Sequence, residues 1–244
     1  MLEAMPLQPV HRRSVPDEVF DQVLAEVVDG EIGAGESLPS ERRLAEVLGV
    51  SRPAVREALQ RMAATRLVEV RHGGATTVRD FKRYAGLDLL PRLLVRRGEL
   101  DPDVARSVLE ARLAIGPAVA ALAAGRAGPP VSAVLHIVVD RLAATDDDVE
   151  RQVLALEFWD HVVDSADSLV FRLMFNGLRA AYEPALEALA PLMAEEVGQI
   201  EAYRLLASAL GSGDPETARA AADRVLRPAT ESLLSALAAL EEED

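Results

Sequence analysis

The stretch from Ser40 to Val78 constrains the fold more than any other part of this sequence, because it indicates two short helices followed by two short strands. Ser40 and Ser51 are each placed to cap a helix, and Gly49 lies in the tight turn between them. Apolar residues recur with helical spacing on one face of each helix: Leu44, Val47 and Leu48, then Val55, Ala58, Leu59 and Met62. Two short helices joined by a glycine-containing turn are the signature of a helix-turn-helix motif.

The residues after these helices predict a β-hairpin. Residues 67–71 and 75–78 alternate and are rich in β-branched side chains, and His72, Gly73 and Gly74 lie between them. Glycines at a hairpin tip would let the backbone approach a phosphate or a narrow minor groove, where His72 can donate a hydrogen bond. A helix-turn-helix followed by such a hairpin predicts a winged helix.

Three arginines lie where a winged helix would meet DNA. Arg52 and Arg56 are four residues apart, so they project from the same face near the start of the second capped helix. That end of a recognition helix enters the major groove, where guanidinium groups contact guanine or phosphates. Arg42, near the start of the preceding helix, is placed to meet a backbone phosphate. Two arginines alone indicate no more than a solvated face, but together with the glycine-tipped hairpin they favour a DNA-reading surface.

The distribution of charge supports a nucleic-acid-binding module joined to a different domain. The formal net charge is −14. Residues 41–80 hold eight basic and five acidic side chains, and residues 81–100 hold five and two, so each segment carries +3. Residues 101–244 hold 11 basic and 25 acidic side chains, which amounts to −14. A basic island ahead of an acidic body is typical of such a module.

Composition favours a mainly helical protein. Half of the 244 residues are hydrophobic, only 4% are aromatic, and alanine and leucine dominate. The absence of cysteine excludes disulfides and thiolate metal sites and fits a reducing compartment. The sequence has no uninterrupted apolar run of about 18 residues and no signal-peptide pattern at its start, so we expect a soluble, cytoplasmic protein with no membrane partner.

We expect three segments along the chain: a winged-helix DNA-binding domain at residues 1–80, a basic helical linker at 81–100 and an all-helical domain at 101–244. In the last segment, amphipathic patterns predict helices near residues 102–125, 131–143, 148–165, 167–190, 193–211 and 215–240. Pro117 and Pro184 lie inside two of these runs and are expected to kink or split them.

The segment GESLPSERRLAEVLGVSRPAVREALQRMAATRLVEVRHGGATTV resembles the winged helix of the GntR family of bacterial transcription regulators. The resemblance covers residues 15–80 and holds at the caps, the turn, the recognition helix and the wing together. With the continuation into RDFKRYAGLDLLPRLL, the chain is most similar to the FadR branch, which is named for a fatty-acid-responsive regulator. The resemblance implies DNA contacts by Arg42, Arg52, Arg56, His72 and Gly73, and further contact positions at Ser40, Glu41 and Ser51.

An all-helical segment after such a winged helix resembles the effector-binding and dimerisation domain of FadR-type regulators. Many members bind a divalent metal there through one Asp and three His, with a small carboxylate as effector. Glu157 and His161, one turn apart and able to face one cavity, match the first acid and the first histidine. The later two histidine positions are Tyr203 and Val225. One carboxylate and one imidazole are too few ligands for a tight site, so we expect a degraded site that holds no metal.

The metal-free branch of the family, which responds to long-chain acyl-CoA, is the other model. The segment LALEFWDHVVDSADSLVFRLMFNGLRAAYE resembles its corresponding pair of helices, including the aromatic at Tyr182. The apolar residues that could line a tunnel for an acyl chain, which are equally typical of a bundle core, are Phe158, Val162, Phe171, Met174 and Phe175. The candidate effector-binding residues are therefore Glu157, His161, Tyr182 and Tyr203, and both acyl-CoA and a metal-dependent small carboxylate stay open as effectors.

With these patterns, the resemblance implies a homodimeric, ligand-responsive transcription regulator, such as a repressor of fatty acid metabolism, that binds a palindromic operator in double-stranded DNA. An enzyme with a regulatory winged helix is the alternative from another class. The sequence assigns no catalytic residues, because it has no cysteine, no glycine-rich nucleotide loop, no serine elbow and only one histidine beside a carboxylate. A structural protein that uses its winged helix for protein contacts would not need the arginine pair and the glycine-tipped hairpin.

Overall fold

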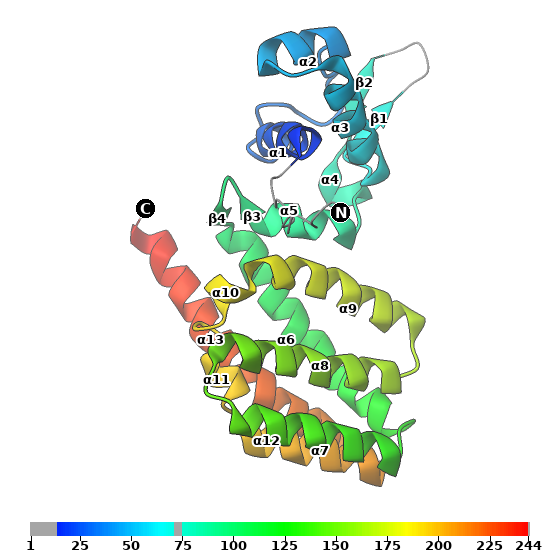
Figure 1. The fold of residues 1–244 in the computed structure, drawn as a ribbon, viewed down its shortest axis with the longest axis vertical. Helices are drawn as coiled ribbons and strands as arrows, with labels where there is room; N and C mark the ends of the chain where they lie inside the picture. Colours follow the sequence, from blue (N-terminus) through cyan, green and yellow to red (C-terminus); the bar gives the residue numbers. More distant parts are fainter. Residues whose placement is uncertain (1–13, 71–74, 244) are drawn as a thin grey trace, which may run out of the picture. The chain divides into compact units, whose positions relative to one another are not determined.

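The computed structural model describes residues 14–70 and 75–243, with side chains described as far as residue 239. Their contacts divide the chain into two compact units, Met1–Leu89 and Leu90–Asp244. Figure 1 shows the helices and the short hairpins of both units. Each unit is described by itself below.

The first unit is a winged helix. Its elements are α1 (Val15–Val28), α2 (Glu41–Leu48), α3 (Arg52–Ala64), β1 (Val68–Val70), β2 (Thr76–Val78), α4 (Phe81–Tyr84) and the short 3-10 helix η1 (Leu87–Leu89). Helices α1 and α2 both pack against α3, and the buried core includes Phe20, Leu24, Val55, Met62 and Leu67. The two strands pair antiparallel, with Val68 opposite Val78. The predicted arrangement of helix, turn, helix and hairpin is therefore confirmed.

Local signals fix the turn between α2 and α3. The Ser40 side chain accepts a hydrogen bond from the backbone N–H of Arg43, and Ser51 accepts one from that of Ala54. Gly49 ends α2 with φ at 66°, a left-handed conformation that glycine adopts without strain. These are the caps that the sequence predicts, and they set the angle at which α3 leaves the turn.

A third extended segment, which the sequence did not indicate, pairs with the hairpin. The segment before α2 runs beside β2, with an isolated bridge between Ser37 and Thr77. The backbone N–H of Leu38 donates to the carbonyl of Thr76, at 2.8 Å, and the N–H of Val78 donates to that of Glu36, also at 2.8 Å. The hairpin is therefore fixed to the body of the unit by backbone hydrogen bonds as well as by its packing.

The second unit is helical apart from a two-residue strand pair. Its elements are α5 (Leu90–Leu94), β3 (Val95–Arg96), β4 (Glu99–Leu100), α6 (Pro102–Ala124), α7 (Pro129–Ala144), α8 (Asp148–Ser165), α9 (Leu169–Tyr182), η2 (Glu183–Ala185), α10 (Leu186–Leu189), α11 (Ala194–Val197), α12 (Ile200–Ser212) and α13 (Pro215–Glu243). Helix α13 packs against α6 and α12, α12 packs against α7, and α7 packs against α8. The mainly helical fold class is confirmed.

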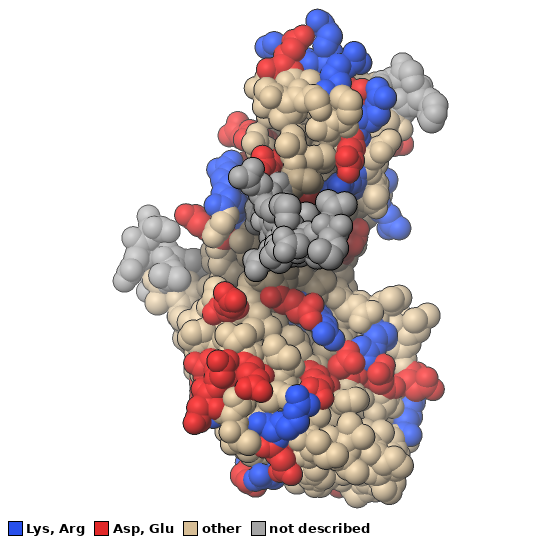
Figure 2. Space-filling view, viewed as in Figure 1, with Lys and Arg blue, Asp and Glu red and all other residues tan. Residues whose placement is uncertain are grey.

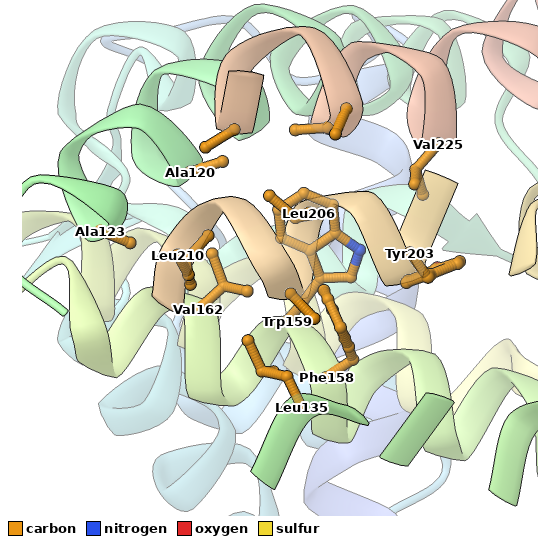
Figure 3. Packing of buried hydrophobic residues seen from close by; sticks show 14 of the residues in the cluster. Ala120, Ala123, Leu135, Phe158, Trp159, Val162, Tyr203, Leu206, Leu210 and Val225 are labelled. Carbon is orange, nitrogen blue, oxygen red and sulfur yellow. The ribbon is translucent and has the colours of Figure 1, made fainter. Parts of the chain in front are cut away.

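Aromatic contacts lie at the centre of this unit. The ring of Phe158 meets the ring of Tyr203 edge-on, with centroids 4.9 Å apart, and it meets Trp159 at 6.3 Å. Figure 3 shows these three side chains surrounded by aliphatic residues from neighbouring helices, among them Leu206 and Val225. Edge-on pairs of this kind add to the stability gained from burying the rings.

The run expected over residues 167–190 is split at Pro184, as predicted: α9 ends at Tyr182, because Pro184 has no N–H to continue it, and a separate turn begins there. Two other sequence predictions differ from the observed elements. The helix expected from residue 193 is divided into α11 and α12, which begins at Ile200. Helix α6, in contrast, runs through Pro117 without a break in its assignment.

Among the described helices, α6 alone is long and apolar enough to cross a bilayer by length and composition. Part of the apolar surface of α6 is buried in the core of the second unit. Val119, Ala120 and Ala123 of this helix belong to the main buried cluster of the second unit. The same composition is typical of the central helix of a bundle.

Replacing Ser51 by alanine removes the acceptor that caps α3, so we expect the first unit to lose about 1 kcal/mol of unfolding free energy. Ser51→Asp is the matched control, because a carboxylate at this position caps a helix equally well. Chemical denaturation followed by far-UV circular dichroism measures the effect. Equal losses in both variants, or none in Ser51→Ala, would show that the cap does not stabilise α3.

Candidate nucleic-acid interface and effector cavity

The arginines that the sequence predicts as DNA contacts are exposed on the first unit. Arg52 is the first residue of α3 and Arg56 lies one turn later, both at the surface. Within residues 14–70 and 75–243, Arg52 has no ion-pair partner, which leaves its guanidinium available to a ligand. Figure 2 shows basic side chains gathered over the part of this unit that carries α2 and α3.

Arg56 is held in place by an acid on the neighbouring helix. Its Nε donates to Oε1 of Glu41 at 3.2 Å, and its Nη2 donates to Oε2 at 2.9 Å. The hydrogen bond from Arg56 lowers the pKa of the Glu41 carboxyl, so this acid is ionised at neutral pH. Two parallel hydrogen bonds restrict the rotation of the long side chain, and the pair also connects α2 to α3.

The remaining candidates lie at the same end of the motif. Arg42 extends into solvent on α2 and contacts only Glu46, one turn away on its own helix, at 3.2 Å. Ser40 and Ser51 are exposed at the starts of α2 and α3, where backbone N–H groups point outward. His72 and Gly73 lie outside the described residues. The structure therefore places six of the eight predicted DNA contacts on two adjacent helix starts.

A cavity of about 120 Å³ lies inside the second unit. Helices α6, α8 and α9 form most of its wall, and α11 and α13 contribute one residue each. Most of the wall is apolar, with Phe171, Met174 and Phe175 of α9 opposite Trp159 and Val163 of α8. A concave, apolar space with a few polar groups is the usual form of a small-molecule site.

A buried ion pair lies at one side of the cavity. Nη2 of Arg112 on α6 donates to both carboxylate oxygens of Glu196 on α11, at 2.7 and 2.9 Å. Only 3% of the Glu196 side chain is exposed. Burial raises the pKa of Glu196, whereas the charge and the hydrogen bonds of Arg112 favour its ionised form. The geometry is that of a carboxylate whose two oxygens both accept from one guanidinium nitrogen.

Two further polar side chains line the cavity and contact each other. The hydroxyl of Tyr182 donates to Oε1 of Gln152 at 2.8 Å, and Nε2 of Gln152 donates to the backbone carbonyl of Met193 at 3.2 Å. Burial raises the pKa of Tyr182, so its hydroxyl stays neutral at physiological pH. The chain of hydrogen bonds fixes which way the Gln152 amide points.

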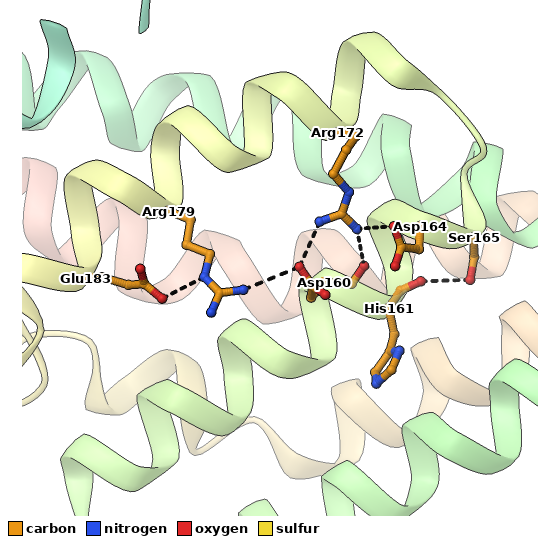
Figure 4. Close-up of polar contacts among 7 residues, drawn as sticks. All are labelled: Asp160, His161, Asp164, Ser165, Arg172, Arg179 and Glu183. Carbon is orange, nitrogen blue, oxygen red and sulfur yellow. Dashed lines mark hydrogen bonds and ion pairs between the residues drawn. The ribbon is translucent and has the colours of Figure 1, made fainter. Parts of the chain in front are cut away.

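The four candidate effector residues do not meet at this cavity. Tyr182 lines it, but Glu157, His161 and Tyr203 do not. Glu157 and His161 share a face of α8, yet that face points away from the cavity, and Glu157 accepts from Arg141 of α7 at 3.0 Å. Figure 4 shows His161 directed away from α9. The expectation that Glu157 and His161 face one cavity therefore does not hold for this cavity, and their role as effector ligands stays a prediction.

The residues at the metal-ligand positions of the family do not fit a metal. Tyr203 and Val225 are buried in the core, as Figure 3 shows, whereas Glu157 and His161 lie on the outer side of α8. Across residues 14–70 and 75–243, no three His, Cys, Asp or Glu side chains lie close enough together to hold an ion. A single imidazole beside one carboxylate gives too few ligands.

Sequence reasoning missed the polar residues that matter most for the cavity. Arg112 and Glu196 are 84 positions apart, and each looks like an ordinary charged residue of an amphipathic helix. Gln152 likewise has no distinctive neighbours in the sequence. Trp159 could have been noted, because it is the chain's single tryptophan.

Ion pairs hold α9 over the cavity, as Figure 4 shows. Arg172 donates to the side chain of Asp160 and to its backbone carbonyl, both at 2.7 Å, and it also donates to Asp164. Arg179 contacts Asp160 at 3.4 Å and Glu183 at 2.7 Å. Phe171 and Phe175 of α9 also pack, partly buried, against the core, so the polar contacts add to apolar ones in fixing the helix on α8.

Arg172→Met should loosen α9, because it removes three hydrogen bonds to α8 and keeps the apolar stem. We expect amide hydrogen exchange over residues 169–182 to accelerate, with a loss of about 1 kcal/mol in unfolding free energy. Arg227→Met is the control, since Arg227 contacts only Asp223 and Glu231 of its own helix. Exchange over α9 that is unchanged in Arg172→Met would contradict a clamping role.

Tyr203→Phe should leave the protein as stable as before, or raise its unfolding free energy by up to about 1 kcal/mol. The hydroxyl of Tyr203 is buried and makes no hydrogen bond of standard geometry among the described residues, although the indole N–H of Trp159, also unpaired, lies near enough to act on it, and a poorly paired buried hydroxyl is costly. Tyr182→Phe is the matched comparison and should lose about 1 kcal/mol, because it removes the bond to Gln152. Thermal denaturation of both variants tests the pair of expectations, and a marked loss in Tyr203→Phe would reveal a partner for that hydroxyl.

A winged helix with exposed arginines at the start of its recognition helix, followed by a helical bundle with a cavity, defines a DNA-binding transcription regulator. The comparison with family models gives the family. Residues 16–78 match the bacterial regulatory proteins of the gntR family, and residues 107–228 match the FCD domain. The chain belongs to the GntR family, and its second unit contains an FCD domain.

Relatives and solved structures agree with this assignment. The HTH-type transcriptional regulator Mce2R of Mycobacterium tuberculosis is 57% identical over 233 residues, which cover 96% of this chain and 97% of that protein. The fatty acid metabolism regulator protein of Edwardsiella ictaluri is 32% identical over 151 residues, 61% of each chain. The structure of Lar, which controls the expression of the Listeria monocytogenes agr system, has a TM-score of 0.54 at 16% identity, over 92% of this chain and 98% of that one. The family and its fold are those of regulators and not of enzymes.

Proposed function

We propose that this protein is a cytoplasmic homodimer that binds a palindromic operator through its winged helices and changes its affinity for DNA when an effector enters the cavity. The observation that carries the proposal is the pair of arginines at the start of α3. Arg52 is exposed and unpaired within the described residues, and Arg56 is held by Glu41 in a defined orientation. A fixed guanidinium loses less rotamer entropy on binding, so it suits the reading of a base edge.

The other candidate contacts position the motif on the phosphate backbone. Arg42 extends from the start of α2, and the backbone N–H groups after Ser40 and Ser51 present the positive ends of two helices. His72 and Gly73 of the wing would add contacts in the adjacent groove. In this arrangement the arginines of α3 read the base sequence of the DNA, and the remaining contacts fix the position of the motif along the duplex.

Dimerisation follows from the need to read a two-fold symmetric site. Exposed apolar side chains support a protein interface on the second unit. Leu169 is 74% exposed, Val170 is 65% exposed and Leu173 is 58% exposed, all at the start of α9. Large apolar side chains that are grouped in this way on a surface are typical of contact regions.

Helix α9 provides a route from the effector to DNA binding. It forms one wall of the cavity and also packs on α5, where Leu94 and Ala181 belong to one buried cluster. Helix α5 begins at Leu90, directly after the last residue of the first unit. An effector that shifts α9 would therefore act on the segment that leads to the winged helix. If the effector binds one conformation of that segment more tightly than another, it changes the affinity of the protein for DNA. The apolar wall matches the hydrocarbon chain of acyl-CoA, whereas the anionic head group of that ligand would have to stay outside the cavity.

Arg52→Ala and Arg56→Ala should each weaken operator binding about tenfold or more, the range expected for losing one guanidinium at a base or phosphate. For a lost phosphate contact, the slope of the logarithm of the binding constant against the logarithm of the salt concentration should also fall in magnitude by about 1. Arg227→Ala changes the net charge equally on the second unit and serves as the control. Fluorescence anisotropy on a fragment selected by the unaltered protein measures all three, and unchanged affinity in both α3 variants would show that the recognition surface lies elsewhere.

A further inference from the structure

The charged groups that line the cavity are already neutralised by the protein. The guanidinium of Arg112 donates to both oxygens of Glu196, at 2.7 and 2.9 Å. Arg179, the other cation in the wall, contacts Asp160 at 3.4 Å and Glu183 at 2.7 Å. Among the described residues, the cavity therefore offers no cation without a carboxylate partner.

An ionised ligand would enter this space at a high cost. A carboxylate loses its water on entering an apolar cavity and needs a cation in return. Glu196 accepts from only one nitrogen of Arg112, so a carboxylate that reached the remaining N–H groups would lie beside a second, buried carboxylate and share a single cation with it. Burial that already raises the pKa of Glu196 adds to this penalty. The charge balance thus selects against anions.

The uncharged polar groups have hydrogen-bonding capacity to spare. Tyr182 uses its hydroxyl proton on Gln152, so its oxygen can still accept. Gln152 uses one amide proton on the carbonyl of Met193, and its second amide proton can still donate. One acceptor beside one donor matches an alcohol group, which both donates and accepts.

We propose that the cavity takes an uncharged, largely apolar ligand with a hydroxyl at its polar end, and that it discriminates against carboxylates of the same length. This ligand acts as an effector only within the proposed function, in which a molecule in the cavity changes the affinity for DNA. The ligand class does not depend on the DNA-binding surface. The hydrocarbon part of the ligand lies against Phe171, Phe175 and Trp159, and its hydroxyl meets Tyr182 and Gln152.

The chain carries its own probe for this test, because its one tryptophan lines the cavity. Titration of the full-length protein at pH 7 with 1-decanol and, separately, with decanoate can be followed by the fluorescence of Trp159. The two probes have the same chain length and differ in charge. We expect saturable binding of 1-decanol that is tighter than that of decanoate by about tenfold or more, which corresponds to about 1.4 kcal/mol. Equal or tighter binding of decanoate, or no binding of 1-decanol, would overturn the proposal.

Two variants test the charge balance directly. Glu196→Gln keeps a hydrogen-bond acceptor for Arg112 but removes its neutralising charge, so the preference should move toward decanoate. The double variant Arg112→Met with Glu196→Leu removes both charges together and should keep the preference for 1-decanol. Circular dichroism and thermal denaturation establish that each variant is folded. An unchanged preference in a folded Glu196→Gln protein would show that the ion pair does not set selectivity.

A DNA-binding measurement separates this proposal from the proposed function. If 1-decanol binds in the cavity as expected and operator affinity does not change, the ligand class stands and effector control of DNA binding by that ligand fails. If both Arg52→Ala and Arg56→Ala bind DNA normally while 1-decanol still binds, the recognition surface is wrong and the cavity assignment is unaffected.

Discussion

The polar side of the cavity in the second unit depends on the buried contact between Arg112 and Glu196. A charged group inside a bundle is costly unless its partner is held in place, and here the partner comes from α11, a helix of four residues. Helices this short are not stable by themselves. The ion pair joins α11 to α6 beside the cavity, in addition to the packing of α11 on α13 and α8. The same contact already balances the charge of Arg112, so a carboxylate ligand would find no unpaired cation there.

The first unit is built on a different principle. Its core is small, and its geometry is set by two serine caps, one left-handed glycine and a hairpin hydrogen-bonded to the segment before α2. Rigid elements of this kind present Arg52 and Arg56 without relying on distant contacts. On the proposed DNA-reading surface, the long side chain of Arg56 is likewise fixed by a local contact, its ion pair with Glu41 of the same motif.

How much of the structure the sequence predicted depends on the range of the interactions involved. The caps, the turn, the recognition helix and both strands were predicted closely, because each depends on residues a few positions apart. The split of the run at residues 167–190 was predicted from Pro184, whereas the same expectation failed at Pro117, where α6 continues unbroken. Glu157 and His161 were correctly placed on one face of a helix, but helical spacing alone cannot say whether that face meets a cavity or a neighbouring helix.

The sequence by itself determined the class of protein and the helix-turn-helix that presents the arginines, because short-range hydrogen bonds, glycine conformation and the spacing of arginines depend on nearby residues. Only the tertiary structure decided where a ligand can bind. Arg112, Gln152, Tyr182 and Glu196 come from four separate segments, and nothing in the local pattern of any one of them predicts the others. The cavity exists because those segments pack around one core, and its charge balance exists because two side chains 84 positions apart meet inside it.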